Sequence, residues 1–299
     1  MDGGGPVGAV VDGRAFVQTG SERGLGPSLR WAMANRAERL ELIAEADVAP
    51  DLARRAKLLE AEIGVWAADG PTVEPATAAP VLTPPELSVD HLRYGPLIAE
   101  TGARPIDDHG TLIAEIAGLE VARVVEAEDG SGPKLDVGVG QADRELQGFI
   151  HGHLDDDTNL RRAVAAVLEH RRPGSAGHPL TRLGRQRWLR SVLLDDPRLV
   201  GLDSLEPLVP LRPRTTLLGD EPSAAAGPDA VVVCSVGVDL DLLPEAVDYR
   251  ARDWPDAELV VVVPERDRGL ATDALAAVVP NLRVEAMAGP WDPAEPGSR

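Results

Sequence analysis

Two short runs of consecutive apolar residues in the last third of the chain constrain its fold most. Residues 231–236 and 259–263 are each long enough for one strand, and helical patterns over 242–252 and 270–279 follow them. A third short strand is expected at 283–286. Continuous apolar strands that alternate with helices are typical of parallel strands covered on both faces. The C-terminal third therefore predicts an α/β arrangement.

The first 70 residues predict a similar arrangement. Asp12-Gly13 lies between two apolar stretches, and this dipeptide is typical of a type I′ hairpin turn. Pro27 suits the first turn of a helix. The expected order is strand, strand, helix, strand, helix, strand, at residues 7–11, 14–18, 27–36, 39–44, 51–59 and 63–67.

The segment between these two parts begins with prolines. Five prolines lie between residues 71 and 85, a density that prevents helix and central strand. Beyond it, a hairpin is expected over 111–139, with a helix at 158–170 and another from Thr181, as N-cap, to 194. Residues 195–228 are rich in proline and glycine and are expected to be irregular.

The sequence thus predicts an α/β protein with two α/β portions of short, mostly parallel strands and β-hairpins. A Pro-rich linker joins them, and the second carries a helical insertion. The expected divisions are an N-terminal α/β unit at 1–70, the linker at 71–90, an α/β domain at 91–288 with a helical and irregular insertion at 153–228, and a disordered tail at 289–299.

Charge and composition exclude several classes of partner. The formal net charge of −19 disfavours binding over the whole surface to nucleic acids or anionic membranes, which it repels. No apolar run approaches the roughly 20 residues that span a bilayer, and the N-terminus lacks a signal-peptide pattern. Cys234 is the only cysteine, and its apolar strand favours a buried, inert thiol. These features predict a soluble, acidic, cytoplasmic protein.

A glycine-rich loop between the second strand and the first helix is a phosphate-loop candidate. Its residues are Gly20, Arg23, Gly24 and Gly26. Backbone N–H groups at a helix N-terminus bind phosphate, and an arginine adds positive charge. The loop lacks the Gly-Lys-Ser/Thr ending and the third glycine of the known nucleotide fingerprints, so a structural turn is the alternative.

Histidines and carboxylates between 151 and 157 are candidate ligands for Mg²⁺ or another divalent metal. The residues are His151, His153, Asp155 and Asp157, and imidazole and carboxylate groups at such density bind divalent ions. The alternative is that the aspartates precede a helix, where negative charge is favourable. Asp107-Asp108-His109 is a similar group, for which a polar loop is expected. Otherwise no cofactor is expected.

The region 153–190 differs in charge from the rest of the chain. Eight arginines face four acidic residues there, a local net charge of +4. Solvent-facing arginines would bind an acidic protein or a phosphate-bearing ligand. Arg182, Arg185 and Arg190 are the candidates for this contact. Internal ion pairs are the alternative.

Two features resemble the restriction-endonuclease-like nuclease fold. They are Pro133-Lys134-Leu135-Asp136 and the strand–helix–strand unit from Val231 to Val263. The resemblance covers at most residues 90–287. It implies that Asp136 takes the place of the first metal-binding carboxylate. The family's Glu-x-Lys is missing from the chain, so the resemblance implies a core whose nuclease chemistry is lost or displaced.

The sequence does not determine the biochemical activity, the ligand or the oligomeric state. The leading hypothesis is a non-enzymatic cytoplasmic binding or regulatory protein with a degenerate nuclease-like core. The first alternative is a metal-dependent nuclease or phosphodiesterase that uses Asp136 with the 151–157 cluster. The second is a nucleotide-binding protein that uses the glycine-rich loop.

Overall fold

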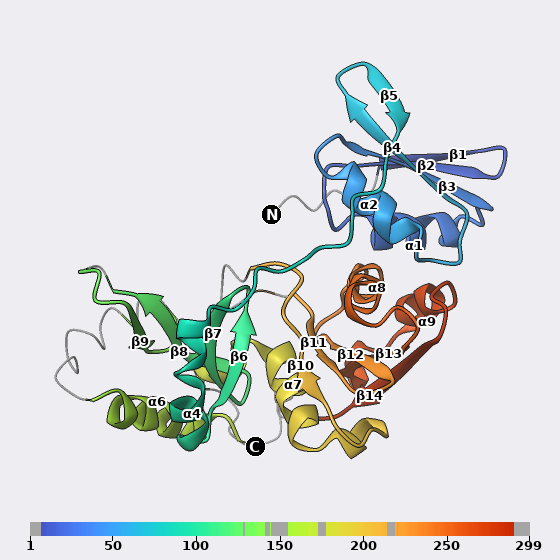
Figure 1. The fold of residues 1–299 in the computed structure, drawn as a ribbon. Coiled ribbons are helices and arrows are strands. Elements are labelled where there is room, and N and C mark those ends of the chain that lie inside the picture. Colours follow the sequence, from blue (N-terminus) through green and yellow to red (C-terminus); the bar gives the residue numbers. More distant parts are fainter. Residues whose placement is uncertain are drawn as a thin grey trace. The chain divides into compact units, whose positions relative to one another are not determined.

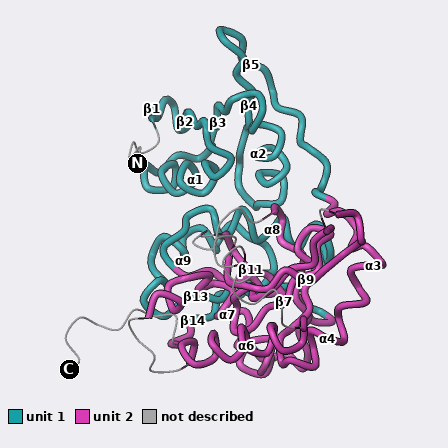
Figure 2. The backbone as a smooth tube through the Cα atoms, turned by 90° about the vertical axis from the view of Figure 1, so that its left-hand side faces the viewer, with its two compact units in different colours: residues 1–82, 229–231, 237–286 teal, residues 83–228, 232–236, 287–299 magenta. Residues whose placement is uncertain are grey.

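The computed structural model describes residues 7–127, 129–140, 144, 155–172, 178–213, 219 and 221–289. It contains helices and three sheets, with both parallel and antiparallel strand pairs (Figure 1). The α/β class expected from the sequence is therefore confirmed. The chain forms two compact units (Figure 2), of which unit 1 comprises residues 1–82, 229–231 and 237–286 and unit 2 comprises 83–228, 232–236 and 287–299.

This division differs in one respect from the segments expected from the sequence. The unit boundary between Leu82 and Thr83 falls inside the Pro-rich stretch. Residues 237–286, however, belong with the N-terminal part and not with the middle of the chain. The reason is tertiary, because the helices at 25–34 and 49–56 contact those at 242–253 and 270–276. The pattern of apolar residues in a sequence does not predict which helices pack together.

The N-terminal sheet of unit 1 has the order β1-β2-β3-β4-β5. Its strands are β1 (Val7–Val11), β2 (Arg14–Thr19), β3 (Arg39–Glu45), β4 (Ile63–Asp69) and β5 (Thr72–Pro75). The pairs β2–β3 and β3–β4 are parallel, whereas β1–β2 and β4–β5 are antiparallel. Asp12 and Gly13 have φ angles of 49° and 75°, as the predicted type I′ turn requires. β5 places proline at a sheet edge, where its missing N–H is tolerated.

Helices α1 (Leu25–Ala34) and α2 (Ala49–Ala56) lie on one side of this sheet (Figure 1). Both contact β3, whose Leu40, Leu42 and Ala44 are buried. Both helices also contact α8 (Leu242–Asp253), and α1 contacts α9 (Leu270–Ala276). Unit 1 is therefore closed by elements from the two ends of the chain.

A second sheet has the order β10-β11-β12-β13-β14. Its strands are β10 (Glu206–Pro207), β11 (Ser223–Ala226), β12 (Ala230–Cys234), β13 (Glu258–Pro264) and β14 (Leu282–Met287). β12 is buried along its whole length, and β13 is buried from Leu259 onward. Both were expected from their apolar runs. A short 3₁₀ helix, η3 (Glu265–Asp267), follows β13.

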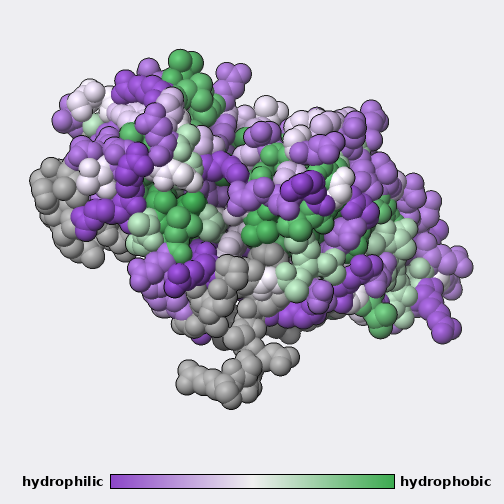
Figure 3. All heavy atoms as spheres, turned by 90° about the horizontal axis from the view of Figure 1, so that it is seen from below, coloured by the Kyte–Doolittle hydropathy of each residue, from purple (hydrophilic) through white to green (hydrophobic). Residues whose placement is uncertain are grey.

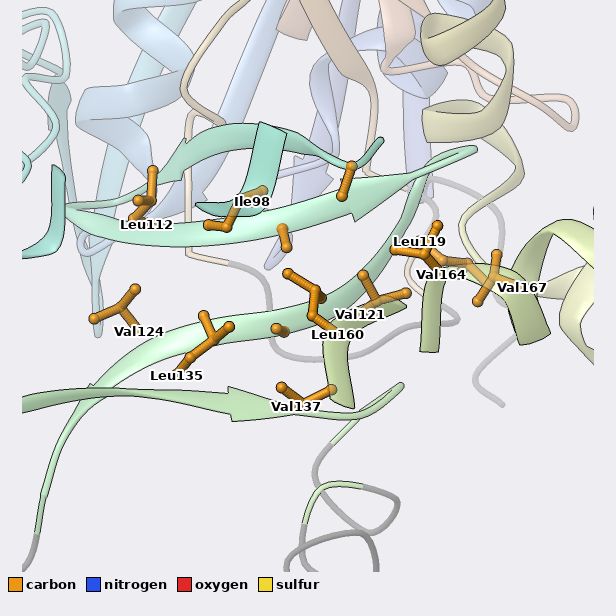
Figure 4. Packing of buried hydrophobic residues seen from close by; sticks show 13 residues of the cluster. Ile98, Leu112, Leu119, Val121, Val124, Leu135, Val137, Leu160, Val164 and Val167 are labelled. Carbon is orange, nitrogen blue, oxygen red and sulfur yellow. The ribbon is translucent and has the colours of Figure 1, made fainter. Parts of the chain in front are cut away.

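Unit 2 contains a four-stranded antiparallel sheet in the order β6-β7-β8-β9. Its strands are β6 (Arg104–Asp108), β7 (Thr111–Ile116), β8 (Leu119–Glu126) and β9 (Pro133–Val137), and its helices are α3 (Val89–Leu92), α4 (Gly95–Glu100), α6 (Asp156–His170), η1 (Pro179–Arg182), α7 (Arg185–Asp195) and η2 (Pro197–Val200). Side chains of α6 and of the sheet together form a buried core (Figure 4). Leu160, Val164 and Val167 are its contribution from α6.

The start of α7 corrects one sequence prediction. Thr181 was expected to cap the helix, but it lies in η1, and α7 begins after Gly184. Gly184 adopts a left-handed conformation with φ of 46°, which favours glycine. A second glycine fixes the position of α7: a Cβ on Gly118, in the β7–β8 turn, would lie 2.2 Å from the backbone nitrogen of Trp188. The turn therefore packs directly on the α7 backbone.

One carboxylate links the two ends of the chain inside unit 1. Asp248 of α8 accepts hydrogen bonds from Nε and Nη2 of Arg54, at 2.9 and 3.0 Å, and from Nε of Arg55 at 2.7 Å. Arg55 is fully buried, and Asp248 is nearly so. Arg55 also donates to the carbonyl oxygen of Glu22, and Arg54 to Asp51.

We expect Asp248→Asn to destabilise the protein by about 3–5 kcal/mol, because it leaves two buried guanidinium groups without their shared carboxylate. Urea unfolding measures the change. Asp273→Asn is the matched control on α9, since its partner Arg268 and Asp273 itself are half exposed, and exposed pairs contribute about 0–1 kcal/mol. Equal losses in both variants would contradict the role assigned to Asp248.

Candidate functional site

The glycine-rich loop is occupied by the protein's own carboxylates. The backbone nitrogen of Gly26, at the start of α1, donates to Oδ1 of Asp241 at 2.9 Å. Arg23 pairs with Asp239, and its Nε lies 3.4 Å from Oε1 of Glu245. Two of the groups expected to hold a phosphate, the Gly26 N–H and the Arg23 guanidinium, thus serve an internal contact between α1 and the loop before α8.

The glycines of this loop have steric reasons to be present. A Cβ on Gly26 would lie 1.8 Å from the carbonyl oxygen of Leu240, so the backbone there would have to shift. Cβ atoms on Gly24 and Gly20 would meet the side chains of Thr19 and Glu45. The Gly24-Leu25-Gly26 pattern therefore permits close packing, which is the structural alternative considered for the sequence.

Asp241 is electrostatically unusual. The pKa of its carboxyl is raised to about 7, mainly by burial and in addition by the nearby Glu245 and Asp239 carboxylates, while the Gly26 N–H and Arg23 oppose the shift. A carboxyl whose pKa is raised in the folded state stabilises the protein at low pH, below the unfolded pKa of about 4. That contribution is lost as pH rises through about 7.

Asp136 is held in ion pairs. Its Oδ2 lies 3.2 Å from Nε of Arg144, and Nη1 of Arg144 donates to Oε1 of Glu120 at 2.9 Å. Arg123 forms two further bonds to Glu120, at 2.7 and 2.9 Å, and lies 3.7 Å from Asp108. Three carboxylates of β6, β8 and β9 thus share two arginines, Arg123 and Arg144.

The metal candidates are not brought together among the described residues. His151 and His153 lie outside them. Asp155 is the N-cap of α6 and accepts bonds from the backbone nitrogen and hydroxyl of Thr158, and Asp157 pairs with Arg161 one turn away. Within the described part of the chain, no group of three or more histidine, cysteine, aspartate or glutamate side chains is arranged to hold a metal ion. Asp107 accepts from Gly110 in the β6–β7 turn, as the polar-loop interpretation expects.

The arginine surface predicted for the 153–190 segment needs correction. Arg182 is exposed and Arg185 is half-buried, but Arg190 is only 1% exposed and pairs with Glu115 of β7 at 2.6 Å. Most of α7 is buried, with Trp188, Leu189, Leu193 and Leu194 packed inside the protein. Position 190 therefore lies in a buried part of the helix. Arg190 therefore cannot contribute to a solvent-facing contact.

A pocket of about 450 Å³ lies in unit 2 beside α6. Its walls are mainly aliphatic, and its side chains come from the end of β9, one face of α6 and the η1 segment; the lining residues are Val137, Gly138, Val139, Asn159, Arg162, Ala163, Ala166, Val167, His178, Leu180 and Leu183. Val137 and Val167 belong to the core in Figure 4 as well. The pocket is thus a hollow at the edge of the packed α6–sheet interface.

Three of the lining side chains are polar. Arg162 supplies positive charge, Asn159 an amide and His178 an imidazole. Nδ1 of His178 accepts a bond from the backbone nitrogen of Leu180 at 3.3 Å, and its ring stacks on His170 at 3.7 Å. An accepting Nδ1 leaves Nε2 as the protonated nitrogen of a neutral ring. The pocket therefore combines apolar walls with hydrogen-bond donors and one cationic group.

Arg171 holds the η1 wall of this pocket in place. Its Nη1 donates to the carbonyl oxygens of Leu180 and Leu183, at 3.2 and 2.6 Å. Sequence reasoning pointed to the arginine-rich region but missed the pocket. The sequence contained one weak indication of the pocket. Two small residues, Ala163 and Ala166, lie on the same face of α6 as Asn159 and Arg162 and leave space there.

Figure 3 shows one face of the molecule, on which hydrophobic patches alternate with hydrophilic residues. Among the described residues, no helix has both the length and the apolar character needed to cross a membrane.

Comparison with known proteins found no match to the chain among family models, curated proteins or solved structures. Any function must therefore be argued from the geometry of the chain itself.

We expect the stability of Asp241→Asn, relative to the unsubstituted protein, to increase by about 2 kcal/mol between about pH 5.5 and pH 8. The variant keeps an oxygen for the Gly26 N–H but never carries the charge that burial disfavours. Urea unfolding across this pH range measures the difference. Asp47→Asn removes one negative charge at an exposed site and controls for net charge. A constant difference between Asp241→Asn and the parent at every pH would contradict the expectation.

We expect the purified protein to leave DNA and RNA intact in the presence of Mg²⁺ or Mn²⁺, because Asp136 is paired with Arg144 and the chain lacks the Glu-x-Lys of the nuclease fold. A nuclease assay with labelled single- and double-stranded substrates tests this. Metal-dependent cleavage that disappears in Asp136→Ala, and persists in the exposed control Asp129→Ala, would show that the carboxylates are catalytic.

Proposed function

We propose that this protein is a non-enzymatic cytoplasmic binding or regulatory protein, and that its ligand occupies the pocket beside α6. The observation that carries the proposal is the composition of that pocket, which is aliphatic except for Arg162, Asn159 and His178. Small-molecule sites usually have this character, with apolar walls and a few well-placed polar groups. The volume of about 450 Å³ suits a ligand of metabolite size.

The pocket chemistry favours a ligand with an apolar body and an acidic head group. Arg162 attracts a carboxylate or phosphate, and Nε2 of His178 is a neutral donor. The aliphatic side chains of Val139, Leu180 and Leu183 suit a hydrocarbon chain, whose burial contributes about 0.8 kcal/mol per CH₂ group. This refines the phosphate-bearing or acidic partner expected for the 153–190 segment.

The other functions considered for the sequence have less support. The ion pairs of Asp136 with Arg144, and of Arg144 with Glu120, favour a binding function over metal-dependent hydrolysis. The Asp241 and Asp239 contacts of the glycine-rich loop compete with a nucleotide phosphate. A degenerate nuclease-like core is compatible with the proposal but adds nothing to it. The cytoplasmic location is supported by the single cysteine, Cys234, which is buried.

We expect octanoate to bind to the protein and octylammonium, with the same chain and the opposite charge, to bind much more weakly. Calorimetric titration of the full chain with each probe, and with neutral octanol, separates the contribution of the head group from that of the chain. Arg162→Gln should weaken octanoate by about tenfold, the value of one charged hydrogen bond, and leave octanol unchanged.

Two further variants complete this test. Arg161→Gln is the matched control, because Arg161 is the neighbouring arginine on α6 and pairs with Asp157 at the surface. Ala166→Phe, at an exposed lining position, should reduce binding of octanoate and octanol alike by filling the pocket. Octanoate binding that is insensitive to both Arg162→Gln and Ala166→Phe would place the ligand elsewhere and overturn the proposal.

A further inference from the structure

The strand β1 forms one edge of the N-terminal sheet of unit 1. Among the described residues it pairs with β2 alone, so no other strand lies along its outer edge there. All of its residues are exposed, with Val7 at 78%, Val11 at 54% and Val10 at 41%. An exposed apolar strand at a sheet edge presents backbone N–H and C=O groups to which a further strand can pair.

β1 lacks the features that protect edge strands from such pairing. Its sequence, Val-Gly-Ala-Val-Val, has no charged residue and no proline, and its register with β2 is continuous from Val7 to Val11. The strand at the other edge of the sheet, β5, contains Glu74 and Pro75, two residue types that discourage pairing. Of the two edges of this sheet, β1 is therefore the one suited to a further strand.

Gly8 and Val10 point to the side of the sheet on which α1 lies. Gly8 is opposite the buried Val17 of β2. Val10 is opposite Ala15, which is also buried. A Cβ on Gly8 would lie 3.0 Å from the ring of Trp31 of α1. The aromatic ring thus packs directly over the glycine, and it is itself only partly buried.

Val7, Ala9 and Val11 point to the other side of the sheet, because successive side chains of a strand alternate between its faces. Neither α1 nor α2 lies on that side (Figure 1). Ala9 is opposite Phe16 of β2, which is 38% exposed. The exposed apolar surface therefore runs along β1 and onto the neighbouring strand.

The sequence of β1 is complementary to itself in the antiparallel direction. When two copies pair about a two-fold axis at Ala9, Val7 of each copy lies opposite Val11 of the other, and β-branched side chains favour such cross-strand pairs. Val10 of one copy then lies opposite Gly8 of the other, on the side where Trp31 leaves part of its ring exposed. No charged residue occupies the paired positions, so the contact avoids direct repulsion between two chains of net charge −19.

We propose that two copies of this chain associate by antiparallel pairing of β1 about a two-fold axis at Ala9, which joins their N-terminal sheets. A second copy is the expected occupant, because a two-fold contact requires a surface that complements itself, as the opposition of Val7 and Val11 does. The contact covers 5 residues of each copy, which is small for a protein interface. We therefore expect a reversible dimer that forms in the micromolar range.

The first experiment uses the unsubstituted full chain. Sedimentation across the micromolar range should show a monomer–dimer equilibrium. Dimerisation should strengthen as salt is added, since screening weakens the repulsion between two acidic copies. Hydrogen exchange of the amides of residues 7–11 should slow as the protein concentration rises, because the second strand covers them.

Charge variants at the two-fold axis test the register. Ala9→Lys and Ala9→Glu each place like charges opposite one another, and each should weaken dimerisation at least about tenfold. An equal mixture of the two variants should dimerise again, because the lysine of one copy then faces the glutamate of the other. Val73→Lys and Val73→Glu, at an exposed position of β5, are the matched controls and should dimerise as the parent does, alone or mixed. Circular dichroism checks that each variant is folded.

Three results would overturn the proposal. The first is an unsubstituted chain that stays monomeric with concentration-independent exchange at residues 7–11, which would leave the edge to a strand of a different protein. The second is dimerisation undiminished in both folded Ala9 variants, which would place the contact elsewhere. The third is a mixture of folded Ala9 variants that stays monomeric, which would show that position 9 does not face itself. Should a variant fail to fold, the exchange at residues 7–11 of the unsubstituted chain decides.

Discussion

The carboxylate of Asp248 is the interaction on which the organisation of the chain depends. It binds Arg54 and Arg55 across 194 and 193 positions of sequence, inside unit 1. All three side chains are buried, so the pairs are formed where water does not compete. Because this contact joins α2 to α8, residues 83–228 are inserted between two parts of one compact unit. The Pro-rich stretch is then the exit from unit 1, and not a link between two consecutive domains.

The same principle operates around the glycine-rich loop. Arg23 and the Gly26 N–H have the chemistry of a phosphate site, but Asp239 and Asp241 satisfy them. A chain with 49 acidic residues and 30 basic ones has carboxylates in excess. A positively charged or N–H-rich group that comes within reach of them is therefore satisfied by one of the protein's own carboxylates, as Arg23 and the Gly26 N–H are.

In unit 2, Arg171, Arg187 and Arg190 are buried at the end of α6 and along α7, and Arg190 pairs with Glu115 of β7. Arg171 is connected to the pocket beside α6 through η1 and Leu183, since it donates to the carbonyl oxygens of Leu180 and Leu183 while their side chains line the pocket. A change in the environment of Arg171 would thus be transmitted directly to one wall of the pocket.

The sequence by itself determined the features that depend on neighbours in the chain. Apolar runs gave β12 and β13, Asp12-Gly13 gave the first hairpin, and Asp155 to Asp157 marked the start of α6. Only the tertiary structure decided the rest. Whether Arg190 faces solvent depends on Glu115, 75 positions away, and whether Gly26 binds a phosphate depends on Asp241, 215 positions away. Periodicity and local charge describe one element at a time, whereas burial and ion pairing are set by the elements that pack against it.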